Sequence, residues 1–102
     1  MNIKLQYLYR DAANYKNYGE VIFFNSEERL IEDVQKLIYV NLIDGEYFYT
    51  DNWKLPDKHF QDWDSEIDLQ WHEFLKVELT NEKPTDLLDR TFSNFIKGIE
   101  KS

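Results

Sequence analysis

Residues 3–24, IKLQYLYRDAANYKNYGEVIFF, decide the fold, because they contain two strand-like runs separated by a turn. In residues 3–9 apolar and polar side chains alternate, which is the period of a strand with one buried face. Residues 20–24 are rich in β-branched and aromatic side chains, and the Asn-containing stretch 11–18 leads to Gly19 between the two runs. We therefore predict a long antiparallel hairpin.

Two further elements follow the hairpin. Ser26 stands before two glutamates as an N-cap stands before a helix, and residues 27–40 repeat apolar side chains at helical spacing. This pattern predicts a helix over residues 27–40. Asp44 and Gly45 then supply a turn signal, and residues 46–50 (EYFYT) predict a short aromatic strand.

The C-terminal third predicts one more strand and one more helix. Residues 69–80 (LQWHEFLKVELT) alternate again, with a phase slip near Phe74 and Leu75 that indicates a bulged strand. Either Thr85 or Asp86 is expected to cap the last helix. The buried stripe of this helix should consist of Leu87, Leu88, Phe92, Phe95, Ile96 and Ile99.

The element order ββαββα, with two amphipathic helices, predicts an α+β two-layer sandwich whose antiparallel sheet has about four strands. Both helices are expected to cover one face of the sheet. Residues 51–68 show no sustained period and predict a long loop with a turn of helix; loops of this length are uncommon and often functional. No Gly- or Pro-rich linker divides the chain, so residues 1–102 are predicted to be a single domain.

Composition limits the partners of this domain. The chain has 20 acidic and 12 basic residues, a formal net charge of -8, and no cysteine. The charge opposes nucleic acid and anionic membranes, so we expect neither as a partner. The lack of cysteine excludes disulfides and a cysteine nucleophile. With no long apolar run or apolar leader at the N-terminus, a soluble protein in the cytoplasm is expected.

The negative charge is concentrated in one part of the chain. Residues 1–43 and residues 69–102 each carry a net charge of -1, whereas residues 44–68 carry eight acids and two lysines, a net charge of -6. A local field of one sign speeds encounter with an oppositely charged protein, and aromatic side chains beside it can anchor the complex. The predicted partner-binding residues are Asp44, Glu46, Tyr49, Asp51, Trp53, Asp57, Asp62, Trp63, Asp64, Glu66 and Asp68. A simpler interpretation is that the acids keep a loop hydrated while the aromatics fill the core.

Neither a metal site nor a catalytic site has a recognisable motif. His59, Asp62 and Asp64 are close in sequence and could serve as metal ligands or as an acid and base pair. Their spacing does not match a calcium loop. His72 lies on a predicted strand with no nucleophile motif nearby, so a structural histidine is the favoured interpretation. We therefore predict no enzyme activity, no cofactor and no metal.

Two runs, YLYRDAANYKNYGEVIFF at residues 7–24 and WHEFLKVELTNEKPTD at residues 71–86, resemble a family of small acidic bacterial proteins of mostly unknown function. The resemblance spans nearly the whole chain. Some similar proteins serve as immunity partners of polymorphic or contact-dependent growth inhibition toxins. The resemblance implies no catalytic residues.

Charge and resemblance together favour an immunity protein that binds a basic toxin domain, most plausibly a nuclease, and occludes its active site. A non-catalytic regulatory module with another basic client is the alternative. A small hydrolase that uses His59 or His72 with nearby carboxylates is the third hypothesis.

Overall fold

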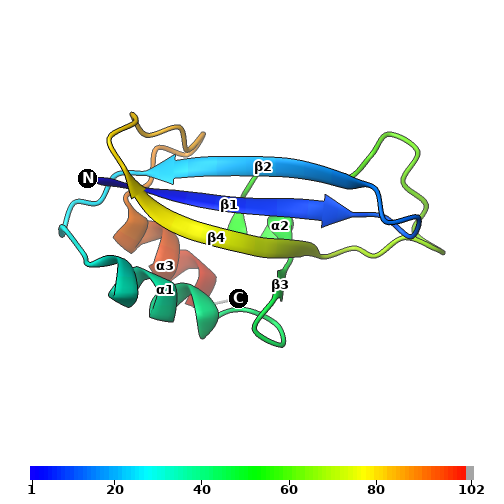
Figure 1. The fold of residues 1–102 in the computed structure, drawn as a ribbon, viewed down its shortest axis with the longest axis horizontal. Helices are drawn as coiled ribbons and strands as arrows, with labels where there is room; N and C mark the ends of the chain where they lie inside the picture. Colours follow the sequence, from blue (N-terminus) through cyan, green and yellow to red (C-terminus); the bar gives the residue numbers. More distant parts are fainter. Residues whose placement is uncertain (101–102) are drawn as a thin grey trace.

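The computed structural model of the chain describes residues 1–100, and its centre is a four-stranded antiparallel sheet (Figure 1). The strands are β1 (Asn2–Arg10), β2 (Lys16–Phe23), β3 (Tyr47–Phe48) and β4 (His72–Thr80). Their order in the sheet is β2-β1-β4-β3, so β1 is paired on both sides. This α+β class and the four antiparallel strands agree with the prediction.

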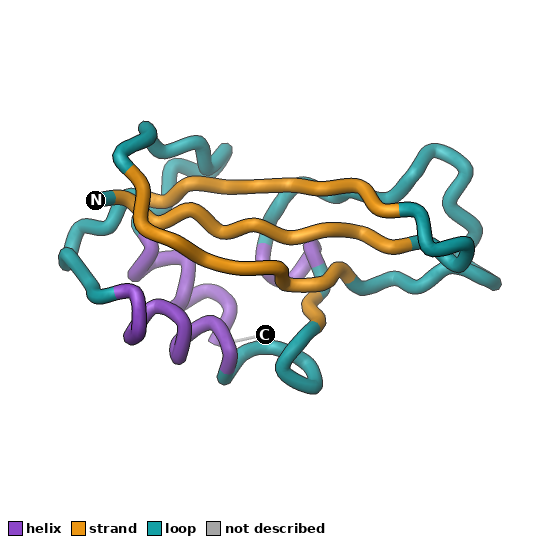
Figure 2. The backbone as a smooth tube through the Cα atoms, in the orientation of Figure 1, coloured by secondary structure: helices purple, strands orange, loops and turns teal. Residues whose placement is uncertain are grey.

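Three helices complete the fold, in the order ββαβαβα. They are α1 (Ile31–Tyr39), α2 (Thr50–Trp53) and α3 (Phe92–Glu100). Figure 2 shows α1 and α3 together on one side of the sheet. The sheet curls into a half-barrel. The four-residue α2 was not predicted as a separate element, because one turn is too short to show a helical period.

The core lies between the sheet and the helices. Alternate residues of β1 (Ile3, Leu5, Tyr7 and Tyr9) are fully buried, as the alternation predicts. The first three join a cluster with Val34 and Ile38 of α1 and with Phe92 and Phe95 of α3. Burial of these apolar side chains is the main source of stability for the fold.

The predicted bulge in β4 is confirmed, and it controls which side chains face the core. Gln6 pairs with Lys76 but Tyr7 pairs with Phe74, so Leu75 is an extra residue in β4. The extra residue reverses the alternation, and the residues before it point to the opposite face from the one they would otherwise take. As a result His72 is fully buried beside Tyr7.

Strand β2 begins at Lys16, four residues before the predicted start. Gly19, which suggests a loop in the sequence, lies within the strand opposite Tyr7. A Cβ atom at Gly19 would lie 2.8 Å from Cζ of Tyr7, so the glycine leaves space for the tyrosine ring. Because β2 begins earlier than predicted, the turn of the hairpin is shorter than predicted. In this turn Asn14 adopts a positive φ of 69°, which Asn tolerates.

The two helix starts predicted from the sequence are wrong. Helix α1 begins at Ile31, because the Asn25 side chain accepts the Arg29 N–H and donates to the Arg29 carbonyl, which holds a turn ahead of the helix. Ser26 is exposed and caps nothing in the described part of the chain. Helix α3 begins at Phe92, after Thr91, whose hydroxyl accepts the Asn94 N–H.

The segment that precedes α3 contacts the end of β2 and forms no helix. Leu87 and Leu88 are 85% and 54% exposed, so their predicted place in a buried stripe is wrong, whereas the other four apolar residues of that stripe are buried. The Thr85 N–H donates to the Ile22 carbonyl, and the Ile22 N–H donates to the Thr85 hydroxyl. The Phe92 N–H donates to the Phe24 carbonyl. Residues 85–92 therefore pack against the C-terminal end of β2 and the residue that follows it.

The remaining differences are at strand ends. Strand β3 is shorter than the predicted 46–50, because Thr50 starts α2, and β4 begins at His72 where the prediction has residue 69. Within residues 1–100, no helix has the length and apolar character needed to cross a membrane.

Candidate functional site

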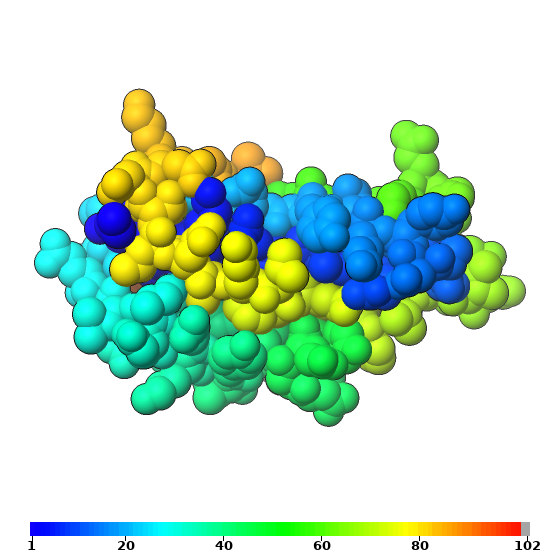
Figure 3. Space-filling view, viewed as in Figure 1, coloured from blue at the N-terminus to red at the C-terminus, as the bar shows by residue number. Residues whose placement is uncertain are grey.

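The candidate site is the segment between α2 and β4, residues 54–71, which we call the acidic loop. It lies at the end of the molecule where β1 turns into β2 (Figure 1), and Figure 3 shows its green to yellow-green surface projecting there. Side chains of the hairpin hold its backbone: the Tyr7 hydroxyl donates to the Pro56 carbonyl at 2.7 Å, and the Asn17 amide donates to the Lys58 carbonyl at 3.1 Å. The loop is therefore anchored to the sheet.

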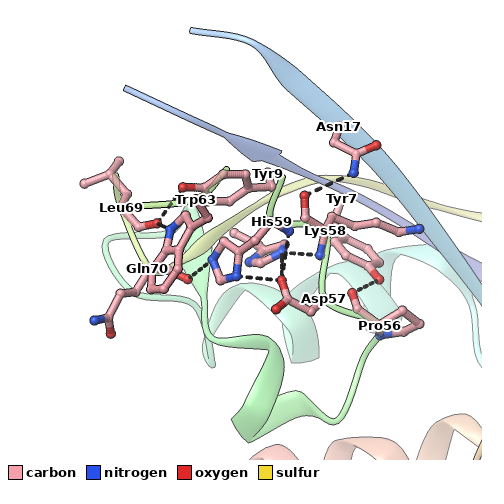
Figure 4. A network of polar contacts seen from close by, with 11 residues as sticks. Tyr7, Tyr9, Asn17, Pro56, Asp57, Lys58, His59, Trp63, Leu69 and Gln70 are labelled. Carbon is pink, nitrogen blue, oxygen red and sulfur yellow. Dashed lines mark hydrogen bonds and ion pairs between the residues drawn. The ribbon is translucent and has the colours of Figure 1, made fainter. Parts of the chain in front are cut away.

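A second anchor holds the C-terminal part of the loop. The Tyr9 hydroxyl donates to the Leu69 carbonyl at 2.7 Å, and the Trp63 indole N–H donates to the same carbonyl at 3.1 Å. Burial raises the pKa of Tyr9, and the negative charge of Asp68 raises it further. The Tyr9 hydroxyl therefore keeps its proton for this hydrogen bond. The neutral donors of two strand tyrosines thus fix both arms of the loop (Figure 4).

Some acids of the loop have a structural task. The Asp68 carboxylate accepts the N–H groups of Ala12 and Asp64, and these hydrogen bonds lower the pKa of Asp68. The Asp64 carboxylate in turn accepts the Glu66 N–H. Backbone hydrogen bonds of this kind order a turn. The Asp64 and Asp68 side chains therefore shape the loop, in addition to the role predicted for them.

Asp57, His59 and His72 form the one cluster of potential metal ligands in residues 1–100 (Figure 4). The distance from Asp57 Oδ1 to His59 Nδ1 is 2.7 Å, and to His72 Nε2 it is 3.5 Å. His72 comes from β4 and is fully buried, whereas the other two belong to the acidic loop. Sequence reasoning missed this cluster, because it grouped His59 with Asp62 and Asp64, and neither belongs to the cluster.

Burial and hydrogen bonding set the charges in this cluster. Burial lowers the pKa of His72 to about 4, helped by the charge of His59, so His72 is neutral at pH 7. Its Nε2 accepts the Lys58 N–H at 2.9 Å. Burial alone would raise the pKa of Asp57, but hydrogen bonds from the His59 backbone and ring lower it, so Asp57 is ionised.

A surface depression of about 310 Å³ opens beside the cluster. Asp57 and His59 form part of its wall, together with Thr50, Asp51 and Gln70. The depression is large enough for water or a small ligand. It brings Asp51 of α2 close to two acidic-loop residues, so these predicted site residues share one surface.

The predicted aromatic anchors have three different environments. Trp53 is 3% exposed and stacks on Phe48 in the core, so the prediction that it contacts a partner is corrected: it has no free face to offer. Trp63 is half-buried and stacks on His59, which leaves part of its ring at the surface. Tyr49 is also half-buried and borders the depression. The simpler interpretation, in which aromatics fill the core, holds for Trp53.

The predicted acidic region is divided in space. Asp44 and Glu46 lie in the turn before β3 and outside the acidic loop, although the neighbouring Tyr47 stacks on Trp71 of that loop. Asp62 and Glu66, by contrast, lie on the acidic loop, and both are exposed.

Six of the twelve acids outside this region pair with lysine or arginine within residues 1–100. Within residues 1–100, no lysine or arginine forms an ion pair with an acid of residues 44–68, and Asp57 pairs only with histidine. Elsewhere, carboxylates pair with lysine or arginine in Lys4–Glu20, Lys4–Glu82, Arg10–Glu73, Arg29–Glu27, Lys76–Glu78 and Arg90–Asp86. In the described part of the chain, pairing with lysine or arginine is therefore found outside residues 44–68 and not within them, as the local charge of the sequence suggests.

Comparison with known proteins found no matching family model, no matching curated protein and no matching solved structure. We therefore argue function from the site itself.

Proposed function

We propose that this domain is a non-catalytic, immunity-type protein that binds a basic partner domain, with a toxin nuclease as the partner class, and occludes the partner's active site. The observation that carries the proposal is the set of exposed acids on the acidic loop that have no lysine or arginine partner within residues 1–100. The acidic loop would supply the principal contact surface.

Unpaired acids are what a basic partner requires. A carboxylate already held by a lysine has to exchange that contact during binding, whereas a free carboxylate gains one. Asp62 and Glu66 are exposed acids of this kind. A nuclease carries cations where it binds phosphate, so carboxylates projecting from a loop can occupy those positions.

The anchoring of the loop supports tight binding. Association loses affinity when a mobile segment has to be ordered, and a segment that is already ordered avoids this loss. Tyr7 and Tyr9 hold the loop from the sheet, and Asp68 holds it from within. Asp62 and Glu66 are thus presented from a fixed backbone, which suits recognition of a defined surface.

The aromatic side chains at the surface provide the apolar part of the contact. Trp63 and Tyr49 both border the depression, and half-buried aromatics of this type are frequent centres of binding energy. Trp53 does not take this role, because the Trp53 ring lies in the core, and Trp63 and Tyr49 remain as the surface aromatics. The proposed contact therefore has an apolar centre with acids around it.

The test is charge reversal on the acidic loop. The variant Asp62→Lys with Glu66→Lys changes two exposed residues whose carboxylates form no hydrogen bond or ion pair described within residues 1–100. We expect a basic toxin domain to be encoded beside the gene; that domain is the binding partner in the experiment, and surface plasmon resonance measures association at low and physiological salt. We expect association to slow by at least about tenfold at low salt, because electrostatic steering is lost.

A matched control is Glu32→Lys, which reverses an exposed charge on α1, away from the loop. The control should leave association within about twofold, since it lies outside the contact surface. Circular dichroism verifies that the variants fold. Unchanged affinity and salt dependence for the double variant would overturn the proposed surface. Tight binding without inhibition of the toxin would favour the regulatory alternative.

A further inference from the structure

We infer that Asp57, His59 and His72 form a binding site for a divalent transition metal ion, with zinc as the best match, at the base of the acidic loop (Figure 4). The inference goes beyond partner binding, since it concerns different side chains and requires no partner. It would give the domain a ligand of its own.

The three donor atoms converge on one point. Asp57 Oδ1, a nitrogen of His59 and a nitrogen of His72 lie within 4.8 Å of one another. Zinc binds imidazole nitrogen and carboxylate oxygen at about 2.0–2.2 Å, which places neighbouring ligand atoms about 3–3.5 Å apart. The two distances from Asp57 Oδ1, 2.7 Å and 3.5 Å, bracket this range. Small rotations of the two loop side chains would therefore complete the site.

The chemistry of the donors is compatible with a cation among them. The ionised carboxylate of Asp57 only accepts, and Nε2 of His72 presents a lone pair, as its hydrogen bond from Lys58 shows. Nδ1 of His59 faces the carboxylate while its Nε2 faces the Gln70 carbonyl. His59 therefore faces two acceptors, the Asp57 carboxylate and the Gln70 carbonyl. If Nε2 donates to Gln70, the contact between Nδ1 and Asp57 is favourable only with a proton or a metal ion at Nδ1. A metal ion there would also reach His72 by replacing the Lys58 hydrogen bond.

The second ring nitrogen of His59 has the partner typical of a ligating histidine. Such histidines usually donate their other N–H to a carbonyl or a carboxylate, which orients the ring. His59 Nε2 lies 3.1 Å from the Gln70 carbonyl, and the ring stacks on Trp63. The orientation of the His59 ring is therefore fixed with Nδ1 directed at Asp57.

The surroundings of the cluster fit a site with an open coordination position. His72 Nδ1, the ring nitrogen that does not face Asp57, is buried without a hydrogen-bond partner within residues 1–100, so His72 lacks the orienting contact that His59 has. The depression beside Asp57 and His59 leaves room for water as a further ligand, with Asp51 on its wall. Three protein ligands and one open position are the arrangement of many zinc sites that bind substrate or water. The surplus of acids in residues 44–68 favours a cation in the same place.

The test is zinc binding by the full chain after treatment with a chelator. Isothermal titration calorimetry with Zn²⁺ should give one site per chain, and Co²⁺ in its place should give the visible absorption of a low-coordinate site with nitrogen and oxygen ligands. The variants His59→Gln and Asp57→Asn each remove one ligand, and each should weaken zinc binding by at least about tenfold. His72→Gln is avoided as the primary variant because His72 belongs to the core.

The matched control is Asp62→Asn, which removes an acid of the same loop that does not belong to the cluster. It should leave zinc affinity within about twofold, apart from a small loss of local negative potential. Absence of one-site zinc binding by the native chain would overturn the inference. Equal binding by the native chain and by both ligand variants would also overturn it, and would assign the ions to surface carboxylates. Partner binding is measured separately with chelator present, so failure of one proposal leaves the other to be judged by its own result.

Discussion

The two ends of this molecule are held in different ways. At the helical end, α1 and α3 pack against β1 through apolar side chains, and two nearby acids, Glu27 and Asp86, are paired with arginine. At the loop end, residues 54–71 are held by hydrogen bonds from strand side chains, and their acids have no lysine or arginine partner within residues 1–100. The difference assigns most of the stability to one end and the unbalanced charge to the other.

Arg90 is the most extensively bonded cation near the helical end. Its guanidinium donates to both oxygens of Asp86 and to the carbonyls of Trp53 and Lys54. It also lies over the Phe95 ring at 5.2 Å. One cation thus joins the segment before α3 to the end of α2, where the acidic loop begins.

The largest effect on stability is expected in the core of the helical end. Phe95 is fully buried, and its ring stacks on Phe23 with centroids 4.4 Å apart. The variant Phe95→Ala should lower the free energy of unfolding by about 3–5 kcal/mol, because the apolar contacts are lost and a cavity remains. Urea denaturation monitored by circular dichroism measures it. A loss below about 1 kcal/mol would contradict the assignment of stability to this end.

The next effect concerns the buried ion pair and its dependence on pH. The Asp86 side chain is 3% exposed, and Asp86→Asn should lower the free energy of unfolding at pH 7 by about 2–3 kcal/mol, since hydrogen bonds to a charged partner are weakened. Burial alone would raise the pKa of Asp86, but the hydrogen bonds from Arg90 outweigh it and lower the pKa below the ordinary 3.8.

The sign of the pH effect follows from this lowered pKa. The folded state binds the proton of Asp86 less readily than the unfolded state, so the contribution of Asp86 is fully present above about pH 4 and is lost as the pH falls through the folded pKa. The difference in the free energy of unfolding between the native chain and Asp86→Asn should therefore become smaller below that pH. Urea denaturation at a series of pH values measures it. A difference that stays constant down to acid pH would refute this account of Asp86.

The smallest effect is expected at the loop end. Tyr9→Phe removes the hydroxyl that donates to Leu69, and it should lower the free energy of unfolding by about 1 kcal/mol, because one buried hydrogen bond is lost. The same variant should increase amide hydrogen exchange within residues 54–71, since this region loses an anchor. Tyr15→Phe is the control, because Tyr15 is 69% exposed. Equal exchange in both variants would mean that Tyr9 does not hold the loop.

The sequence predicts the parts of this fold that depend on periodicity. Alternation locates β1, and the phase slip in the last strand locates the bulge, because each of these leaves a pattern of burial several residues long. The helix starts were predicted wrongly because local hydrogen bonds from single side chains decide where each helix begins. Asn25 and Thr91 hold these turns, while Ser26 and Thr85 look equally suitable in the sequence.

The site could be predicted only in part. Local excess of acids is a property of composition, so the acidic segment is evident from the sequence. The meeting of His59 with His72 depends on the bulge, which turns His72 inward, and on anchors from β1, which bring the loop over it. The spacing of residues in the sequence reveals neither the bulge's effect on His72 nor the anchoring of the loop. The cluster is therefore evident only in the three-dimensional structure.

The segment that packs against the end of β2 affects where a further strand could add to the sheet. Exposed strand edges invite pairing with a further strand, either from another copy or from an extended peptide. Here the backbone groups of Ile22 are already bonded to Thr85, and at the opposite side of the sheet β3 is only two residues long. Strand addition is therefore blocked at the Ile22 end of β2, and β3 offers only a short edge.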